Sequence, residues 1–434
     1  MKIHKMLRVI QNPWFIDTYA KIVKNYFKSY RFLLFKYRKE FQENKEVYEA
    51  RKRRALDAVT MRRIPDRVPV GAGGVNFFPA KYAGITCSDF MFDYKKMRQA
   101  NLKMNTDFDF DVTFPTYMFG MGRFIAATQT NLLKIPGRDL QPNSIYQYHE
   151  IERLKQEEYG ELLEHGLELF MEKIAPRMSP IFNKSLITRL ANYTRILVET
   201  FKYAQIMMKM AIEYRAKGYY NPINAFSFPP MDLMSFAFRT VRGLSRDLLK
   251  KEIRPKVIEF CERMEKWLTP TFSLTQKLFG APGIVVFSER GFSFSPKQYE
   301  TYFWPTFKKM IISFANEGCI PALAIEGDAT HVIHYLLELP KKVARQCIFA
   351  CDQTDIFKAN KILDGHMCIM GNIPLSTMCV GTPKNVEKYC EKLFKELKPG
   401  GGFILSPALG IPDEARPENV HAMINYAHKH GNYE

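Results

Sequence analysis

The fold of this chain is decided by residues 320–372, IPALAIEGDATHVIHYLLELPKKVARQCIFACDQTDIFKANKILDGHMCIMGN. Three short apolar runs, IPALAIE (320–326), CIFACD (347–352) and MCIMGN (367–372), alternate in this stretch with longer amphipathic segments. Strands of a parallel sheet are buried on both faces and therefore read as apolar throughout, and each is followed by a helix. The stretch predicts an α/β fold built from repeated strand–helix units.

The same alternation continues in both directions along the chain. Further apolar runs occur at RVPVG (67–71), 111–117, NAFSF (224–228), GIVVFS (283–288) and FILS (403–406). We expect helices over 89–105, 150–173, 187–217, 245–278 and 295–317, and others beginning near Thr330, Thr354, Thr382 and Pro417. About eight such units in one series, with no GxGxxG after the first strand, favour a (β/α)₈ TIM barrel over an open doubly wound sheet.

Two segments lie outside this series. Residues 118–148 are irregular and contain Gly and Pro, which predicts an insertion after the second strand that covers the barrel mouth. Residues 1–60 predict a helical N-terminal extension, and residues 61–434 the barrel. Within the extension, RFLLFKYRKEF (31–41) fits either a segment lying on a membrane surface or a helix packed across the barrel with its basic ends in water.

Composition limits the classes of protein that need to be considered. The chain has 434 residues and a net charge of +18, and its first 54 residues contain 15 Lys and Arg against 5 Asp and Glu. Such an excess attracts several kinds of anionic partner without choosing among them, and we expect no nucleic acid. Eight cysteines without a CxxC pair indicate reduced thiols in the cytoplasm. No apolar run is long enough for a transmembrane helix. The sequence is compatible with a homodimer but does not decide the oligomeric state.

In a barrel of this type the active site lies at the carboxyl ends of the strands, so the polar residues just after each apolar run are candidates. They are Asn76, Asp232, Ser288, Glu289, Arg290, Glu326, Asp328, Cys351, Asp352, Asp355, Asn372 and Ser406. From these and the nearby arginines we predict catalytic roles for Glu326, Asp328, Asp352 and Glu289, and substrate binding by Asn76, Asp232, Arg239, Arg290 and Asn372.

Several carboxylates in one mouth repel each other unless something offsets their charge. Glu326 and Asp328 are two residues apart and would face the same side of a strand. A raised pKa, a neighbouring arginine or a bound cation could each offset the charge. Glu326 and Cys351 could also bind zinc through mixed oxygen and sulfur ligands. The structural alternatives are a helix cap for Asp355 or Asp328, and core packing for the cysteines.

Four stretches resemble one known family. They are RRALDAVTMRRIPDRVPVG (53–71), DQTDIFKANKIL (352–363), CIMGNIPLSTMCVGTPKNVEKYCEKL (368–393) and GGGFILSPALGIPDEARPENVHAMINYAHKHG (400–431). Their glycine-rich turns and helix starts resemble those of the uroporphyrinogen decarboxylase superfamily. The resemblance implies a TIM barrel and one of two activities, decarboxylation of a porphyrinogen or methyl transfer involving a corrinoid.

The two branches of that superfamily differ in motifs that can be checked here. Haem-pathway decarboxylases carry an arginine-rich stretch after the first strand, but GAGGVNFFPAKYAGI (71–85) has no Arg and a single Lys, Lys81. The methyltransferases bind zinc through a His-x-Cys pair and a cysteine in the last loop. Ala324, Glu326 and Leu409 stand at those positions, so the usual thiol-activating zinc site is missing.

The resemblance therefore favours a methyltransferase of altered chemistry. We expect it to move a methyl group between a small methylated compound and a corrinoid carried by a separate protein. Glu326 would belong to a Lewis-acid site, with zinc as the metal of a variant site. The alternatives are a uroporphyrinogen-type decarboxylase and a barrel that has lost catalysis and serves binding.

Overall fold

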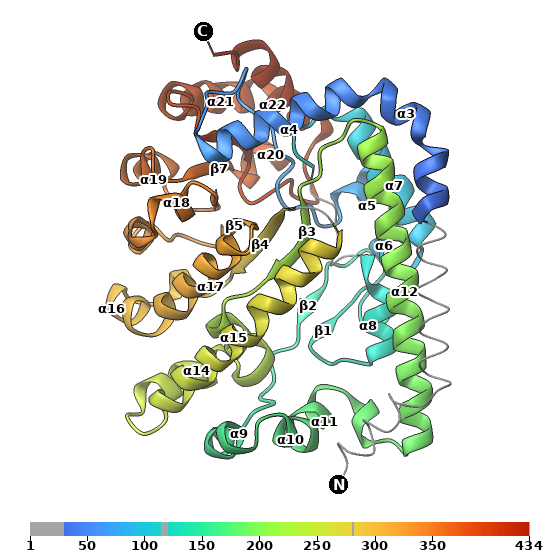
Figure 1. Cartoon of the computed structure of the whole chain (residues 1–434), viewed down its shortest axis with the longest axis vertical. Coiled ribbons are helices and arrows are strands. Elements are labelled where there is room, and N and C mark those ends of the chain that lie inside the picture. The colour runs from blue at the N-terminus through green and yellow to red at the C-terminus, as the bar shows by residue number, and fades with distance from the viewer. Residues whose placement is uncertain (1–29, 114–119, 280–281, 434) are drawn as a thin grey trace.

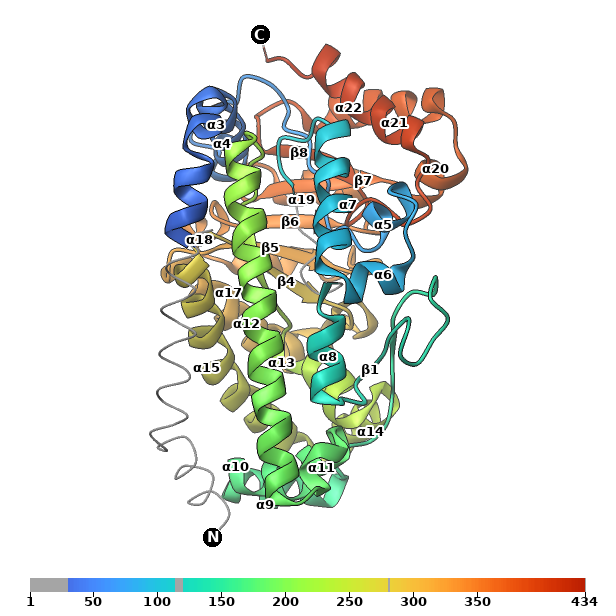
Figure 2. The same ribbon diagram turned by 90° about the vertical axis from the view of Figure 1, so that its right-hand side faces the viewer.

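The computed structural model describes residues 30–113, 120–279 and 282–433. Its centre is a parallel sheet in which neighbours in space are also neighbours in sequence. The strands are β3 (Ile223–Ser227), β4 (Gly283–Ser288), β5 (Ile320–Ile325), β6 (Ile348–Cys351), β7 (Cys368–Ile373) and β8 (Phe403–Pro407). Helices surround these strands, and the views in Figures 1 and 2 show them outside the sheet.

Two short extended segments close this sheet into a barrel. Val70 forms a parallel bridge with Leu405 of β8, and Gly71 forms one with Val112. The N–H of Thr113 then donates to the carbonyl of Tyr220, just before β3, at 3.0 Å. The predicted strands at 67–71 and 111–117 therefore contribute one or two bridges each, and residues 114–117 of the second lie outside the described residues. The predicted TIM barrel is confirmed.

The helices that follow the strands agree in order with the predicted units. They are α13 (Pro230–Leu233), α14 (Val241–Leu249) and α15 (Arg254–Phe279) after β3, α16 (Pro296–Gln298) and α17 (Trp304–Asn316) after β4, α18 (Lys341–Ala344) after β5, α19 (Ile356–Leu363) after β6, α20 (Leu375–Val380) and α21 (Pro383–Leu397) after β7, and α22 (Pro417–His430) after β8. The predicted helix near Thr330 is instead a 3₁₀ turn over Ile333–Glu338, which precedes α18.

The segments before β3 are also mainly helical. They are α3 (Arg38–Glu43), α4 (Lys45–Thr60), α5 (Phe78–Tyr82), α6 (Cys87–Phe92), α7 (Tyr94–Asp107), α8 (Gly122–Thr128), the hairpin of β1 (Leu133–Lys134) and β2 (Gln147–Tyr148), α9 (Tyr159–His165), α10 (Leu167–Leu169), α11 (Ala175–Met178) and α12 (Leu186–Ala216). The single helix predicted over 150–173 was wrong, because helical structure begins only near residue 156 and is interrupted at Gly166, whose φ is +51°. Helix α12 runs along the long axis of the molecule (Figure 1).

Side chains alternate along the strands between the barrel interior and the layer under the helices. Ala322 and Ala324 of β5 lie in the interior cluster together with Ile348 and Ala350 of β6. Phe349 and Cys351 belong to the outer cluster, and so do Leu323 and Ile325. This alternation decides which polar residues at the strand ends can reach the mouth of the barrel.

Helix α4 covers the opposite end of the barrel. Its Ala55, Ala58 and Val59 pack into the interior cluster with Val112 and Ile223. Residues 31–41 contact α12 through Tyr37 and Phe41, as the packed-helix interpretation expects, whereas Phe32 and Phe35 are exposed. The division at residue 60 stays a prediction, and residues 1–29 lie outside the described residues.

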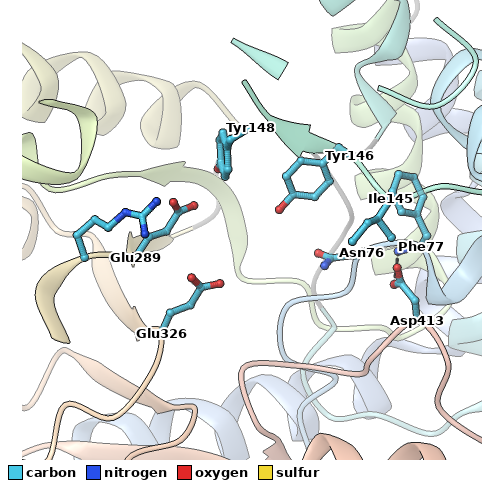
Figure 3. A pocket seen from close by; sticks show the side chains of 9 residues that line it. Asn76, Phe77, Ile145, Tyr146, Tyr148, Glu289, Glu326 and Asp413 are labelled. Carbon is cyan, nitrogen blue, oxygen red and sulfur yellow. Dashed lines mark hydrogen bonds between the residues drawn. The ribbon is translucent and has the colours of Figure 1, made fainter. Parts of the chain in front are cut away.

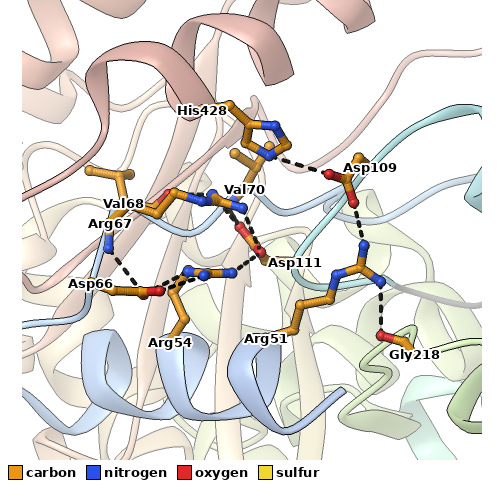
Figure 4. A network of polar contacts seen from close by, with 10 residues as sticks. All are labelled: Arg51, Arg54, Asp66, Arg67, Val68, Val70, Asp109, Asp111, Gly218 and His428. Atoms are coloured by element: carbon orange, nitrogen blue, oxygen red, sulfur yellow. Dashed lines mark hydrogen bonds and ion pairs between the residues drawn. The ribbon is translucent and has the colours of Figure 1, made fainter. Parts of the chain in front are cut away.

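An ion-pair network joins α4 to the first two strand segments (Figure 4). The carboxylate of Asp111 is buried and accepts from Arg54 at 2.6 Å and from Arg67 at 2.7 Å. It also accepts the backbone N–H of Val70 at 2.9 Å, while Arg54 reaches Asp66 as well. Every charge in this network has an opposite charge beside it, which offsets the cost of burying the carboxylate.

Within the described ranges, every helix is too short or too polar to span a lipid bilayer.

Candidate active site

Three carboxyl groups stand side by side where β4, β5 and β6 end. Ser288, Ile325 and Cys351 are aligned in the strand register, so the residues that follow them, Glu289, Glu326 and Asp352, are aligned as well. Each follows an outward-facing residue, so each carboxyl group points to the interior side. Sequence reasoning named all three, and the structure brings them together.

Two of these carboxyl groups, those of Glu289 and Glu326, border a cavity of about 330 Å³, whereas Asp352 lines a neighbouring groove. Figure 3 shows Glu289 and Glu326 on one side of it and Asn76 and Asp413 on the other. Its lining is Asn76, Phe77, Ile145, Tyr146, Tyr148, Glu289, Arg290, Glu326 and Asp413. Arg290 is the only cationic side chain among the described residues that line it, so the cavity is rich in carboxyl groups.

The β1–β2 hairpin supplies the aromatic wall. Tyr146 and Tyr148 are two residues apart on an extended segment, so both rings face the cavity (Figure 3). The hydroxyl of Tyr148 donates a hydrogen bond to the carboxylate of Glu289. The prediction that the 118–148 insertion reaches the barrel mouth is therefore confirmed, although these tyrosines were not singled out from the sequence.

Asp413 was missed as well. It lies in the loop after β8, and its Oδ1 accepts the backbone N–H of Phe77 at 2.6 Å. Burial raises its pKa, and the N–H of Phe77 and the ammonium of Lys81 partly offset this. Ser406 is the candidate that the strand pattern indicates at this strand end, and Asp413 lies several residues farther along, in the loop after β8.

Electrostatics single out Glu326 among the acids. Burial, and then the charges of Glu289 and Asp352, raise its pKa to about 7, against a smaller opposing effect of Arg290. Among the described residues its carboxyl group has no hydrogen bond or ion pair. Burial also raises the pKa of Glu289 and of Asp352, but each of these accepts a hydrogen bond, from Tyr148 and from the N–H of Gly327. Glu326 is therefore the carboxyl group that can exchange a proton near neutral pH.

Asp328 does not join this group. Strand β5 ends at Ile325, and Gly327 has a φ of +74°, which turns the chain away from the direction of the strand. The exposed carboxylate of Asp328 accepts the N–H of Thr330 at 2.9 Å, and its hydrogen bonds with Thr330 lower its pKa. The expectation that Glu326 and Asp328 share a face failed because it assumed a strand that continues past Glu326.

Other predicted site residues lie outside the cavity. Arg239 is paired with the buried Asp247 at 2.6 Å. Asp232 is fully buried behind β4, where neither carboxyl oxygen has a hydrogen bond of normal geometry, although Ser288 and the Arg290 N–H lie close enough to act on its pKa. Asn372 lies in a neighbouring groove, bonded to the carbonyl of Asp352 at 3.1 Å. Their positions give no support to substrate binding in this cavity, whereas Asn76 and Arg290 do line it.

The two predicted zinc ligands do not meet. Cys351 faces the layer under the helices, and its thiol donates to the carbonyl of Thr354 at 3.1 Å, whereas Glu326 faces the interior. Burial raises the pKa of this thiol, which opposes the thiolate that zinc requires. The described residues contain no group of three or more His, Cys, Asp and Glu arranged to hold a metal ion. The described residues thus do not fit the variant zinc site. Asp355, in contrast, caps α19 as the structural alternative expected.

Comparison with known proteins agrees with this architecture. The sequence model of the family described as "Uroporphyrinogen decarboxylase (URO-D)" matches residues 161–430. A protein of Syntrophotalea carbinolica described as "Uroporphyrinogen decarboxylase" is 22% identical over 211 residues, which are 48% of this chain and 60% of that protein. A solved structure, "methyltransferase from Methanosarcina mazei", superposes with a TM-score of 0.59 at 12% identity and covers 87% of this chain and 97% of its own. At that identity the likeness concerns the fold.

Proposed function

Because the chain belongs to the uroporphyrinogen decarboxylase family, we propose that it is a methyltransferase of that family. It moves a methyl group between a small methylated compound and a corrinoid carried by a separate protein. The superposed methyltransferase and the altered motifs after the first strand support this choice of branch. The observation that carries it is the carboxyl group of Glu326, which faces a small cavity and titrates near neutral pH.

The chemistry asks for a proton at the atom that the methyl group leaves. When the carbon–heteroatom bond breaks, its electron pair stays on the oxygen or nitrogen of the donor, and a proton there makes that atom a better leaving group. Glu326 holds such a proton, and the charge of Glu289, which is bonded to Tyr148, helps to keep the pKa of Glu326 raised. Glu326 therefore acts as a Brønsted acid at the position where a Lewis-acid metal was expected. The corrinoid supplies the nucleophile when the partner protein docks.

The decarboxylase alternative meets an electrostatic obstacle. A porphyrinogen with many carboxylates would face Glu289, Glu326 and Asp413, with Arg290 as the single cation of the lining among the described residues. Like charges in a partly buried cavity repel each other strongly. A cavity of about 330 Å³ also suits a small ligand better than a tetrapyrrole.

The test uses free cob(I)alamin as methyl acceptor. The purified protein is mixed with methylamines or with methoxybenzoates, and the formation of methylcobalamin is followed by absorbance. We expect methylation with the wild type and a loss of about 100-fold with Glu326→Gln. Decarboxylation of uroporphyrinogen III, with no methyl transfer, would establish the alternative enzyme. No turnover of any of these compounds would favour a barrel that only binds.

A further inference from the structure

We infer that the cavity takes a small organic cation, a methylated ammonium compound, as the methyl donor. This rests on the proposed methyl transfer and narrows it to one class of substrate. It comes from the combination of carboxyl groups and aromatic rings around one small cavity, drawn in Figure 3.

The charge around the cavity is opposite to that of the chain. The protein has 63 Lys and Arg against 45 Asp and Glu, yet the lining includes three carboxyl groups, those of Glu289, Glu326 and Asp413. Arg290 offsets only part of this negative charge, because its side chain is 29% exposed and lies 4.0 Å from the exposed Glu150. The nearby ammonium of Lys81 is already paired with Glu414. A cationic ligand would relieve the repulsion that these carboxyl groups exert on one another.

The rings make a cation with methyl groups a better fit than a hydrated metal ion. Phe77, Tyr146 and Tyr148 line the cavity together with Ile145. The faces of aromatic rings attract cations, and the best-known ligands of such cages are methylated ammonium groups. Because the hydroxyl of Tyr148 is engaged by Glu289, its ring is what remains for the ligand. Methyl groups of the ligand can pack on these rings while its nitrogen faces the acids.

The proton balance of the transfer suits an amine. A tertiary amine either binds as its ammonium ion, with the proton already on nitrogen, or takes that proton from Glu326, and in both cases an ammonium ion lies beside the Glu326 carboxylate. When the methyl group departs, the electron pair of the C–N bond stays on nitrogen, and the nitrogen leaves as a neutral amine that keeps its proton. The new bond to carbon is made by the electron pair of the reduced corrinoid acceptor, so no further oxidant or reductant is needed.

Binding separates this inference from catalysis. Choline and 3,3-dimethylbutan-1-ol have the same shape and differ in a charged nitrogen against a neutral carbon. By isothermal titration calorimetry at pH 8 we expect choline to bind at least tenfold more tightly, and benzoate not to bind. Glu326→Gln and Asp413→Asn should each weaken choline binding about tenfold, and the asparagine keeps an acceptor for the Phe77 N–H. Asp328→Asn removes the same charge outside the cavity and serves as the matched control.

A second readout follows the proton. Glu289, Asp352 and Arg290 are the charged groups that shift the pKa of Glu326. Asp413 lies across the cavity, and Lys81 lies beyond Asp413. A bound cation should ionise Glu326, so choline binding near pH 6.5 should release protons, measured as a dependence of the binding enthalpy on the buffer. This release should largely vanish in Glu326→Gln, and the affinity of the wild type should rise between pH 6 and pH 8.

The outcomes are distinct for the two proposals. Equal affinity for choline and its neutral analogue, or tighter binding of benzoate, overturns the cation inference. Methyl transfer from methoxybenzoates without cation binding overturns it as well and leaves the proposed function standing. Cation binding without any methyl transfer would overturn the proposed function and leave only the preference of the cavity for cations standing.

Discussion

The two ends of the barrel both bury carboxyl groups, and they treat them in opposite ways. At the end covered by α4, Asp111 lies between the guanidiniums of Arg54 and Arg67. At the mouth, Glu289, Glu326 and Asp352 stand beside one another, with Arg290 as the nearby cation that lowers the pKa of Glu326. Paired charges hold segments together, whereas burial and crowding at the mouth raise the pKa of these carboxyl groups and make them available for chemistry. Stability and function are therefore divided between the two ends.

The largest effect is expected at the paired end. Asp111→Ala leaves Arg54 and Arg67 without their shared partner and removes the acceptor of the Val70 N–H. Breaking a buried pair from one side costs about 3–5 kcal/mol, so the free energy of unfolding should fall by that amount. Urea unfolding followed by circular dichroism measures it. Glu43→Gln, which removes the exposed i,i+4 pair with Lys39, is the control and should change stability by less than about 0.5 kcal/mol.

Loss of an ionisable carboxyl group should have a different effect at the mouth. Glu326→Gln removes an ionisable group from a crowded acidic site, so the folded state should be as stable as the wild type or slightly more stable. Methyl transfer should nevertheless fall about 100-fold because the proton at the leaving atom is lost. Unfolding curves and methylcobalamin formation, measured on the same preparation, check both halves. A variant that loses stability in proportion to activity would show that Glu326 serves structure, like Asp111.

The two ends should also differ in their response to pH. The pKa of Glu326 rises from 4.5 in an unfolded chain to about 7 in the fold, so the folded state binds the proton more tightly. Its contribution to stability is therefore present at and below about pH 4.5 and is lost as the pH rises to 7. Because Glu326 is partly exposed, we expect a loss of about 1 kcal/mol over this range. Urea unfolding between pH 5 and pH 8 should show a smaller loss in Glu326→Gln, and equal slopes would contradict the raised pKa.

A hydrogen bond at the mouth offers a smaller test. Tyr148→Phe removes the donor to Glu289 and keeps the ring. Since that bond lowers the pKa of Glu289, its loss should raise this pKa further and, through a weaker repulsion, lower the pKa of Glu326. The alkaline limb in the pH profile of methyl transfer, where Glu326 loses its proton, should shift by a few tenths of a pH unit to lower pH, with stability reduced by about 1 kcal/mol. An unchanged pH profile would mean that Tyr148 does not influence the protonation of Glu326.

Sequence reasoning reached the barrel because short apolar runs alternate with longer amphipathic segments in one continuous series. GIVVFS was predicted at 283–288, where β4 lies, and the other predicted runs of the sheet overlap their strands. It also reached Glu289, Glu326 and Asp352, because the carboxyl ends of parallel strands meet at one mouth. It could not tell which ends face inward. That depends on the register and the end of each strand: Cys351 is still inside β6 and faces the outer cluster, whereas Asp328 lies beyond the end of β5.

The rest of the cavity was beyond simple strand patterns. Tyr146 and Tyr148 come from a hairpin of two-residue strands, which carries almost no periodic signal. Asp413 follows β8 by several residues, and only the folded loop places it near Phe77. At the other end of the barrel, Asp111 begins the predicted second strand, but this pattern does not indicate its partners Arg54 and Arg67, which are far away in sequence. Long-range pairing of this kind is set by topology.

The smallest effect is expected at an acid that shares the rim but has no part in the site. Asp328 is two residues from Glu326, yet it is exposed, and its bonds with Thr330 lower its pKa. Asp328→Asn keeps an acceptor for the Thr330 N–H, so unfolding should change by less than about 0.5 kcal/mol. Methyl transfer should stay within about twofold of the wild type, because screening by solvent weakens the action of an exposed charge on Glu326. A large loss of activity in this variant would mean that activity depends on the total negative charge at the mouth and not on which carboxyl groups face the cavity. The contrast between the two ends of the barrel would then rest on the number of charges alone.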